Sequence, residues 1–526
     1  MENKNTITIP AEKFRFVTKN DLSHDSKFAT KPVSYFQGAF KRFCKNKGAV
    51  VGGIVISVLV LFAIIAPLFT PFKPAYYDMV YAYVTPKVNF FAENDLGFWD
   101  GCKEKNTSRI GYLKDLALET ETGREIIKGG EYTISDDGSN YTYRYDTYFG
   151  VGFGKYKIIS PEEYKDIQRY QNETGRQVLY PVVNVNDRPT LEKNKYDANI
   201  YYKVENPNAA TLRPKLENGK IVPNYWKYSV GNENGLMAEY DSLRIEGKDG
   251  ILKDGDQYFY VYGRKVDGGI EVRAEYYEYY IYQHTQVMKD GITEPLFLFG
   301  TTQTGKDIFA CLAYGARFSF IFASVVAVVN FVVGVIWGSI SGYFGGKVDL
   351  FMERFAEILG AVPSMIVITL LKYHMGASSQ VLVLFISFFV TGWIGMAGRT
   401  RMQFYRFKNQ EYVLAARTLG ARDARIMFKH IFPNGLGTIV TSFALVIPSM
   451  IYSETSLSYL GIINLEAGNT TSVGTLIAAG QQSIMANAGY VALFPCTFLV
   501  LLMLSFNLFG NGLRDAFNPS LRGTED

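Results

Sequence analysis

The sequence predicts an α-helical membrane protein with six transmembrane helices and an extracellular α+β, strand-rich domain inserted between the first two of them. Apolar runs long enough to cross a bilayer occur only around residues 48–70 and after about residue 316. Residues 72–299 are instead polar and rich in tyrosine, and several of their apolar runs alternate as in strands. Basic residues gather in the segments that join the apolar runs on one side of the membrane.

The charge of the chain is divided between these two regions. Residues 72–299 contain 29 Lys and Arg against 35 Asp and Glu, whereas the whole chain contains 54 against 50. The rest of the chain is therefore basic, as the positive-inside rule predicts for segments on the cytoplasmic side. Membrane topology explains this charge, so we expect no nucleic acid partner.

The cysteines and histidines indicate neither a disulfide framework nor a metal site. Of the four cysteines, only Cys102 falls clearly inside residues 72–299, so this block needs an apolar core, which roughly 220 residues can supply. The four histidines are scattered and lack metal-ligand spacing. We therefore expect no metal and no cofactor in this chain.

The N-terminal region predicts three successive segments. Residues 1–33 carry several charges without periodicity, which is typical of a flexible cytoplasmic tail. Phenylalanines at helical spacing among basic residues predict an interfacial helix over 34–47. Residues 48–70 then form the first transmembrane span. This apolar run is longer and lies farther from the N-terminus than in a cleavable signal peptide, so we expect an uncleaved span with its N-terminus inside.

Residues 76–295 are the predicted extracellular inserted domain. Alternation predicts strands over 141–148 and 154–159, and a long β-hairpin over 257–282 that turns at the glycines after an aspartate. Ser160, followed by a proline and two acids, predicts the start of a short helix. The tyrosines either form a ligand surface or fill strand faces, and the second role is the commoner one.

Five further spans follow the inserted domain. Counting from a cytoplasmic N-terminus places the loop 400–435 and the C-terminus inside the cell. The arginines and lysines between positions 399 and 429 then all lie on the cytoplasmic side. We therefore expect a multi-pass protein of the cell membrane. The five predicted spans are roughly 316–342, 351–372, 379–398, 437–459 and 489–510.

The cytoplasmic loop contains a predicted helical hairpin. Good helix formers run from Glu411 to Leu419, and Gly420 is a typical C-terminal stop. A second helical stretch begins at Asp423 and is expected to end near Pro433. The expected shape is two short helices joined at a glycine.

Two adjacent alanines, Ala415 and Ala416, leave one side of the first helix nearly free of side-chain bulk. Another protein's surface can approach the backbone closely there, so one interpretation is a docking element. The alternative is a hairpin that lies on the lipid headgroups with its arginines facing phosphate.

The residue order in this loop resembles the EAA loop of the membrane subunits of ABC importers. The resemblance rests on Glu-Tyr-Val-x-Ala-Ala-Arg-x-x-Gly-Ala from Glu411 and on His-Ile-Phe-Pro-Asn from His430. Leu414 departs from it, since the family's namesake acid stands at this position. In that family the loop forms coupling helices that seat in a groove of the ATPase subunit. The resemblance therefore implies ATPase-coupling residues, namely Glu411, Ala415, Ala416, Gly420, His430 and Pro433.

Two other stretches resemble the C-type permeases of dipeptide, oligopeptide and nickel transport systems. One begins at Phe299 and precedes the second span, and the other begins at Phe506 and runs to the end of the chain. The resemblance covers about 34–75 and 297–523 and implies the type I ABC importer permease fold, with a permease core over 297–523. It does not cover the inserted domain.

The stretch before the second span also contains a near match to a phosphate-binding P-loop. Gly300, Gly305 and Lys306 have the spacing of that motif. Asp307 stands where a Ser or Thr would hold magnesium, and its charge would repel phosphate. We therefore expect neither an ATPase site nor any other catalytic site in this chain.

Three residues in the spans are candidates for the transport pathway or a subunit interface. Glu357 lies toward the inner end of the third predicted span and Glu454 toward the outer end of the fifth, and both have counterparts in the resemblance. A carboxylate in hydrocarbon is costly, which favours a functional role. The alternative is that each lies near enough to the membrane surface to reach water. Pro363 removes a helix hydrogen bond and is expected to kink its span.

The resemblance implies a permease subunit of an ATP-driven importer that forms half of the translocation pathway. Peptide is the first substrate choice, and nickel or another small solute is the alternative. The implied partners are a second homologous permease subunit, two cytoplasmic ABC ATPase subunits that bind ATP and Mg, an extracellular substrate-binding protein and the lipid bilayer. We expect the inserted domain to receive the binding protein or to contact substrate.

Two other classes of protein stay open. A membrane-anchored extracellular binding or sensory protein would not need six spans. A secondary transporter would not need an ATPase-docking loop.

Overall fold

The structure is a computed structural model. The predicted tail at 1–33 lies outside the residues that it describes, as does much of the chain between 181 and 257. The described residues are 35–94, 96–136, 138–151, 156–180, 205, 215–218, 220–222, 227–229, 258–260, 262–376, 380–465 and 470–517.

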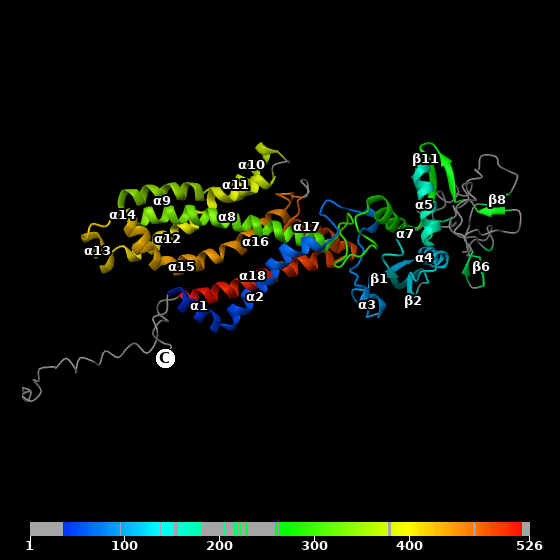
Figure 1. The fold of residues 1–526 in the computed structure, drawn as a ribbon, viewed down its shortest axis with the longest axis horizontal. Helices are drawn as coiled ribbons and strands as arrows, with labels where there is room; N and C mark the ends of the chain where they lie inside the picture. The colour runs from blue at the N-terminus through cyan, green and yellow to red at the C-terminus, as the bar shows by residue number, and fades with distance from the viewer. Residues whose placement is uncertain are drawn as a thin grey trace, which may run out of the picture.

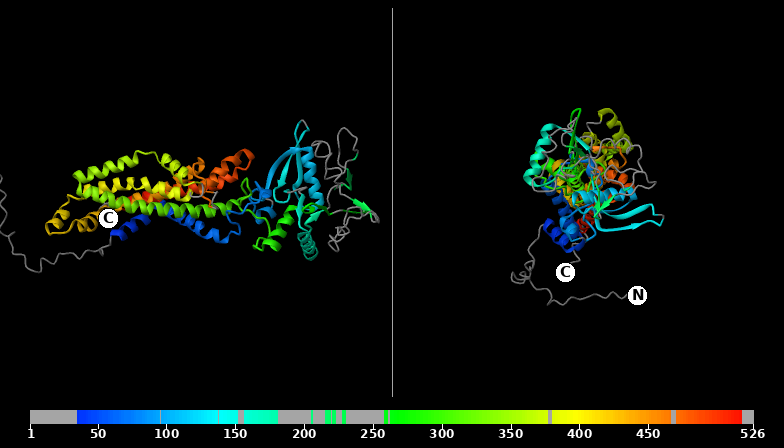
Figure 2. Two further views of the ribbon diagram at one scale, coloured as in Figure 1. Left: turned by 90° about the horizontal axis from the view of Figure 1, so that it is seen from above. Right: turned by 90° about the vertical axis from the view of Figure 1, so that its right-hand side faces the viewer.

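The molecule is elongated, with long helices at one end and a strand-rich block at the other (Figure 1), and the view from above shows the same division (Figure 2). Among the described residues, five helices are long and apolar enough to cross a membrane, or up to six if one bent pair is a single span. The chain is therefore a helical membrane protein, as predicted. The candidate spans are α2 (Lys47–Phe69), α8 (Ile308–Phe344), the run Gln380–Phe407, the run Asp423–Tyr459, α18 (Tyr490–Phe517) and the bent pair α9 (Gly346–Gly360) and α10 (Ser364–Met375).

The long helix α8 packs closely along α12 (Ile394–Phe407). A Cβ on Gly338 would lie 2.2 Å from the carbonyl oxygen of Ala397, and a Cβ on Gly342 would lie 2.8 Å from that of Arg401. Such close backbone contact is typical of helix pairs in lipid, where small residues let the backbones approach. Any larger residue at these glycines would push the two helices apart.

A short helix, α1 (Tyr35–Lys45), packs against the C-terminal end of α18. The Arg42 guanidinium donates to the carbonyl oxygen of Ala516 over 3.0 and 2.7 Å. The ring of Phe43 meets that of Phe509 edge-on at 5.2 Å between centroids. A cation at a helix C-terminus pairs with a free carbonyl and interacts favourably with the helix dipole. A helix thus forms where the phenylalanine spacing predicts one.

The third predicted span, 351–372, is two helices. α9 and α10 meet at a bend of 67°, and α10 begins directly after Pro363. Proline disfavours the helical conformation of the residue before it and has no N–H to donate. The predicted kink at Pro363 is therefore confirmed, and it is sharp enough to divide the span.

A helix that we did not predict, α17 (Val473–Ser483), lies between the last two spans. Ser472 and Thr475 exchange side-chain and backbone hydrogen bonds at its start, a capping box. α17 packs against α8, α16 (Val446–Tyr459) and α18. At 11 residues it is too short to cross a bilayer.

Among the described residues, the strand-rich block contains four antiparallel sheets, of which the two larger have three and four strands. β3 (Asn140–Asp146) lies between β1 (Cys102–Ser108) and β2 (Ile127–Ile134) in the first sheet. In the second, β11 (Gly269–Ala274) pairs with β10 (Gly263–Val266), β4 (Tyr156–Ile159) and β5 (Leu179–Tyr180). The strands predicted over 141–148 and 154–159 correspond to β3 and β4.

The predicted hairpin over 257–282 is only partly right. β10 and β11 pair across the Asp267–Gly268 turn, but residues 276–282 form the helix α7 (Tyr276–Tyr282) and not a strand. The Glu275 carboxylate caps α7 by accepting from the N–H of Glu278 at 3.0 Å. All seven α7 side chains are buried, and a helix buried on every side shows no amphipathic period that distinguishes it from a strand.

Other local predictions hold in this block. α5 (Pro161–Thr174) starts at Ser160, whose hydroxyl accepts from the N–H of Glu163, as predicted. The described tyrosines mainly fill the core: Tyr81 and Tyr148 are fully buried beside Phe297. These two lie outside strands, whereas Tyr143 and Tyr145 are buried on one face of β3, as expected for tyrosines that fill strand faces.

The base of the block is bonded directly to the segment that leads into α8. The N–H of Val84 donates to Thr301 Oγ1 at 2.9 Å, and the N–H of Thr301 donates back to the Val84 carbonyl at 2.9 Å. The block is thus fixed to the helical region at its base. Apart from the elements between 411 and 444, which are described below, the remaining described elements are η3 (Met79–Tyr81), α3 (Asn89–Glu93), α4 (Arg109–Thr122), β6 (Leu216–Glu217), β7 (Lys220–Ile221), β8 (Lys227–Ser229), β9 (Tyr258–Tyr260), η5 (Gln283–Met288), α11 (Gln380–Gly392) and η9 (Ile484–Ala486).

Candidate functional site

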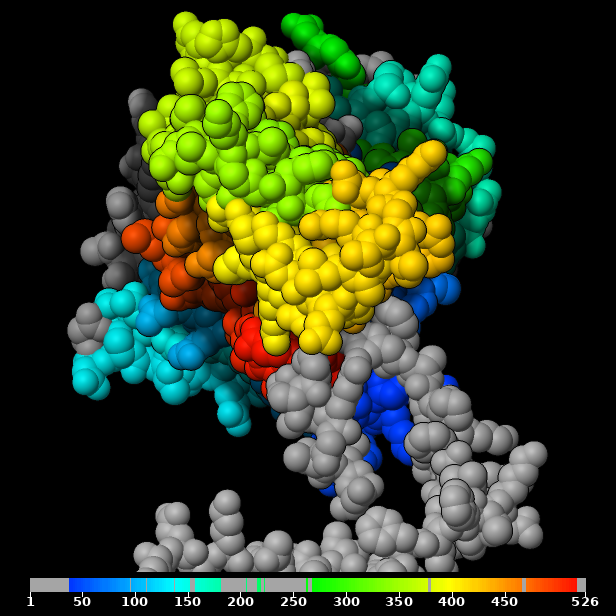
Figure 3. Space-filling model, turned by 90° about the vertical axis from the view of Figure 1, so that its left-hand side faces the viewer, coloured from blue at the N-terminus to red at the C-terminus, as the bar shows by residue number. Residues whose placement is uncertain are grey.

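The predicted hairpin lies at the end of the helical region farthest from the strand-rich block (Figure 1). It follows α12 and projects from the surface at this end, where Figure 3 faces it. Its elements are α13 (Glu411–Thr418), α14 (Asp423–Arg425), η7 (Ile426–Ile431) and the start of α15 (Phe432–Ala444).

An apolar cluster fixes the hairpin to the membrane helices. Val413 is the one buried residue of α13, and it packs with Ile426 and Ile431 of η7. Phe404 of α12 and Tyr343 of α8 complete the contact. Burying one face in this way leaves the rest of α13 free to contact another molecule.

Gly420 ends the first helix as predicted. Its φ of 79° lies in the left-handed region, and the N–H of Ala421 donates to the Ala416 carbonyl at 3.1 Å. A Cβ placed on Gly420 would have no described atom within 4 Å. The backbone conformation, and not lack of space, is therefore what requires glycine.

The outward surface of the hairpin contains apolar residues. Leu419 is 88% exposed, and Tyr412, Leu414 and Phe428 are also exposed. Among the predicted coupling residues, Glu411 and Ala415 are exposed and Ala416 is half-buried. Large apolar side chains that protrude among charges are typical of a surface that another protein covers.

The second helix does not end near Pro433, contrary to the prediction. η7 is a π-helical segment that continues into α15, and Pro433 occupies the first turn of α15. Proline is tolerated there because first-turn N–H groups have no partner within the helix. His430 is half-buried in η7, and its carbonyl accepts from the Asn434 side chain at 2.8 Å. His430 and Pro433 therefore lie where the hairpin joins a membrane helix.

A polar contact links the tip of the hairpin to α8. The Tyr343 hydroxyl donates to Asp423 Oδ1 at 2.6 Å, and Arg417 Nη2 lies 3.5 Å from the same hydroxyl. One residue at the end of α8 thus contacts both arms of the hairpin.

Asp349 of α9 is the centre of a larger polar cluster, which the sequence did not reveal. Its carboxylate accepts two hydrogen bonds from Arg401, at 2.6 and 2.7 Å, and one from the Tyr405 hydroxyl at 2.6 Å. Ser341 donates a further short bond to it. Asp349 therefore joins α8, α9 and α12 just inside the hairpin. The sequence does show two opposite charges, Asp349 and Arg401, near span ends. They are 52 positions apart, so the sequence does not show that they pair.

The two candidate acids lie apart from the hairpin and in different environments. Glu357 is exposed on α9 and pairs with Arg354 at 2.5 Å. Glu454 is completely buried in α16, where it accepts from Ser319 at 3.3 Å and from Ser458 at 3.0 Å. Glu454 thus joins α16 to α8 within the chain.

The near match to a P-loop forms a tight turn. The N–H groups of Gly300, Thr302 and Gly305 donate to carbonyl oxygens within the turn, at 2.9 to 3.0 Å. Asp307 caps α8 by accepting from the N–H groups of Phe309 and Ala310. These amides are already bonded and do not point into an anion-binding loop.

Two family models match the helical parts of the chain. The model described as "Binding-protein-dependent transport system inner membrane component" matches residues 334–523, and the model described as "N-terminal TM domain of oligopeptide transport permease C" matches residues 34–86. Most of the strand-rich block lies between the two matched ranges.

Several curated proteins are similar over comparable lengths. The oligopeptide transport system permease protein OppC of Bacillus subtilis is 41% identical over 232 residues, which are 43% of this chain and 72% of that protein. The dipeptide transport system permease protein DppC of the same organism is 38% identical over 224 residues, 43% of this chain and 69% of that protein. OppC of Escherichia coli is 39% identical over 224 residues, 43% and 72% of the two chains. The chain therefore belongs to the family of binding-protein-dependent transport system inner membrane components.

Proposed function

We propose that this chain is a permease subunit of an ATP-driven peptide importer. The observation that carries the proposal is the hairpin, which presents exposed apolar residues around Gly420 at the end of the helices opposite the inserted block. A surface of this kind suits a partner that binds the hairpin and moves the membrane helices through it. The partners we propose are two cytoplasmic ABC ATPase subunits, which bind ATP and Mg.

Peptide is the proposed substrate because the relatives carry oligopeptide and dipeptide transport in their names. Nickel or another small solute is the alternative, and peptide analysis of material eluted from the purified complex distinguishes the two. In this role the chain is a transport subunit without catalytic chemistry of its own.

The proposed orientation has both termini and the hairpin in the cytoplasm and residues 76–295 outside the cell. It is supported by the basic residues of the hairpin region, including Arg406, Arg417 and Arg425. The inserted block then lies over the outer ends of the helices, where an extracellular substrate-binding protein would dock. Labelling of single cysteines by an impermeant reagent tests this orientation.

A second, homologous permease subunit is proposed to cover α9. Arg354 and Glu357 form an exposed ion pair on a helix that belongs to a candidate span. Charged side chains in a membrane helix face protein or water and rarely lipid. We propose that this face of α9, with the bend at Pro363, lines the pathway or the subunit interface.

The test of coupling compares two glycines in the same conformation. Gly420→Trp should leave membrane insertion intact and abolish substrate-stimulated ATP hydrolysis, because the indole would occupy the space into which the ATPase docks. Gly123 ends α4 with a φ of 69° and equally open space in the described structure, but lies in the inserted block. Gly123→Trp should leave stimulation unchanged, whereas retained stimulation in Gly420→Trp would sink the proposal.

Co-purification after mild detergent extraction separates the classes of function. An importer permease should retain ATPase subunits. A secondary transporter or a membrane-anchored binding or sensory protein should not.

A further inference from the structure

The strand-rich block carries an exposed group of aromatic and aliphatic side chains on and after α3. We call it the aromatic patch, and it consists of Phe90, Phe91, Leu96, Phe98 and Trp99. Phe90 is 64% exposed, Phe98 55%, Leu96 46% and Trp99 36%. So much apolar surface in one place on a block with a buried core of its own requires an explanation.

The patch is a packed unit. The ring of Phe91 lies 5.6 Å from that of Phe90, 5.0 Å from that of Phe98 and 6.4 Å from that of Trp99, measured between centroids. The N–H of Val88 donates to the Trp99 carbonyl at 2.8 Å, which closes the loop. The patch therefore has a defined shape.

Trp99 attaches the patch to a membrane helix. Its ring stacks on Phe494 of α18 at 5.9 Å, and Phe494 stacks in turn on Phe299 at 4.1 Å. The indole N–H donates to the carbonyl oxygen of Leu298 at 2.8 Å. The backbone φ of Trp99 is 52°, which bulky residues rarely adopt. The patch is thus continuous with the outer turn of a transmembrane helix.

Exposed apolar residues also stand at the ends of the two candidate spans nearest this attachment. Leu493 of α18 is exposed next to Phe494, and Leu68 and Phe69 are exposed at the end of α2. In Figure 1, α3 lies just beyond the ends of α2 and α18, on their side of the molecule. In this view α3 and the apolar ends of α2 and α18 therefore lie on one side of the molecule, so that one apolar surface can include all three.

We propose that the aromatic patch is a membrane anchor, which lies in the interfacial layer of the leaflet nearest the inserted block. Tryptophan is enriched at this depth, where its flat apolar face meets acyl chains and its N–H finds a polar partner. Phenylalanine and leucine form the apolar face of segments that lie in the same layer. The partner is a phospholipid surface. Contact with it would fix the orientation of the block over the helices, in addition to the bonds at its base.

The test is quenching of Trp99 fluorescence by brominated lipid. The chain has four tryptophans, so the other three are replaced by phenylalanine in the full chain, which is reconstituted in phosphatidylcholine nanodiscs. Bromine near the headgroup end of the acyl chains should quench Trp99 at least about twofold and more strongly than bromine near the chain ends. In a tryptophan-free chain, Tyr132→Trp provides the matched control, because Tyr132 is an exposed aromatic residue of β2 in the same block. This control should not be quenched, and equal quenching at both positions, or none at Trp99, would overturn the proposal.

A second variant tests whether the phenyl rings hold the patch in lipid. Phe90→Ser with Phe98→Ser, on the single-Trp99 chain, should reduce quenching by shallow bromine at least about twofold. Unchanged quenching would contradict the anchor. The same measurement with the second permease subunit or a binding protein present checks the other occupants, since loss of Trp99 quenching on their addition would assign the patch to a protein partner and overturn the lipid assignment.

Discussion

The Arg401 guanidinium donates two parallel hydrogen bonds to the Asp349 carboxylate, from Nε to Oδ1 at 2.6 Å and from Nη2 to Oδ2 at 2.7 Å. This planar, two-point geometry is specific to arginine and is the strongest form of the ion pair. The pair joins α12, which leads into the hairpin, to α9. We infer that the pair supports both stability and coupling.

Removing one partner of this pair should destabilise the protein. We expect Asp349→Ala to lower the free energy of unfolding by about 3 kcal/mol, because Arg401, Tyr405 and Ser341 all lose their acceptor. Arg354→Ala breaks an exposed pair and should change the free energy by less than about 1 kcal/mol. Thermal unfolding in detergent measures both variants, and similar losses in the two would contradict the role assigned to Asp349.

The sequence predicted those features of this site that depend on neighbouring residues, and it missed those that depend on residues far apart in the chain. The end of α13 at Gly420 is set by neighbouring residues, so the pattern of helix formers and glycine revealed it. Asp349 and Arg401 lie 52 positions apart, and no periodicity relates them. The end of the second helix was wrongly predicted near Pro433 because proline is compatible both with the end of one helix and with the first turn of the next.

The fold shows the same division. The candidate spans were predictable because crossing a bilayer requires long apolar runs. The helix α7 was mistaken for a strand because all of its side chains are buried. Its sequence therefore has no polar positions whose spacing would distinguish a helix from a strand. α17 is short, and packing on α8, α16 and α18 stabilises it, which the sequence alone does not show.

The exposed leucine at the tip of the hairpin should determine ATPase binding. Leu419→Asp is expected to weaken co-purification with the ATPase subunits about tenfold, because it places a charge in an apolar contact. Unfolding temperature should not change, since Leu419 is 88% exposed. Met485 is 97% exposed in η9, away from the hairpin, and Met485→Asp should leave ATPase binding unchanged. A loss in both variants would mean that the assay reports general damage.

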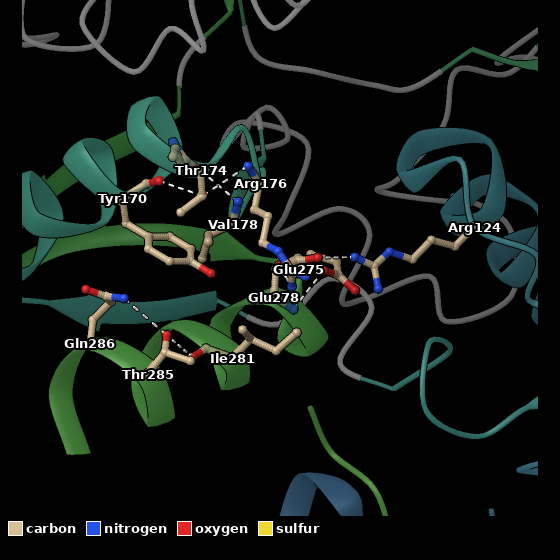
Figure 4. Close-up of polar contacts among 11 residues, drawn as sticks. Arg124, Tyr170, Thr174, Arg176, Val178, Glu275, Glu278, Ile281, Thr285 and Gln286 are labelled. Carbon is tan, nitrogen blue, oxygen red and sulfur yellow. Dashed lines mark hydrogen bonds and ion pairs between the residues drawn. The ribbon is translucent and has the colours of Figure 1, made fainter. Parts of the chain in front are cut away.

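Glu275 should make the stability of the inserted block depend on pH. Burial raises the pKa of its carboxyl from 4.5 to about 7, although nearby Arg124 acts in the opposite direction. Arg124 and Arg176 are both paired with Glu278 at the same place (Figure 4). The folded state therefore holds the Glu275 proton more tightly than the unfolded chain does.

The sign of the effect follows from this difference in proton binding. The free energy of unfolding should fall by about 3 kcal/mol as pH rises from about 4.5 to about 7, and then level off. Glu275→Gln stays uncharged and can still accept the N–H of Glu278, so it should remove this slope. Unfolding curves of the two proteins at several pH values measure the difference, and parallel pH profiles would contradict the prediction.

The buried Glu454 should depend on its serine donors. Ser319→Ala and Ser458→Ala each remove one hydrogen bond and should each cost about 1 kcal/mol. Glu454→Gln should cost less than Glu454→Ala, because the amide oxygen can still accept from one serine. A double-mutant cycle between Ser319 and Glu454, followed by thermal unfolding, measures the coupling. Additive losses would show that the two side chains act independently.

Deleting the strand-rich block should leave the functions of the helical region intact and remove those of the block. The segment around Val84 is bonded to Thr301, so its loss would disturb the start of α8. The deletion must therefore keep this segment. We therefore expect a deletion of 102–274, joined by a flexible Gly/Ser linker, to preserve membrane insertion and ATPase binding. If the block receives the binding protein, the affinity for that protein should fall about tenfold or more and uptake should be lost. Uptake at the normal rate would contradict this role and would leave the block a role in stability or in spacing at the cell surface.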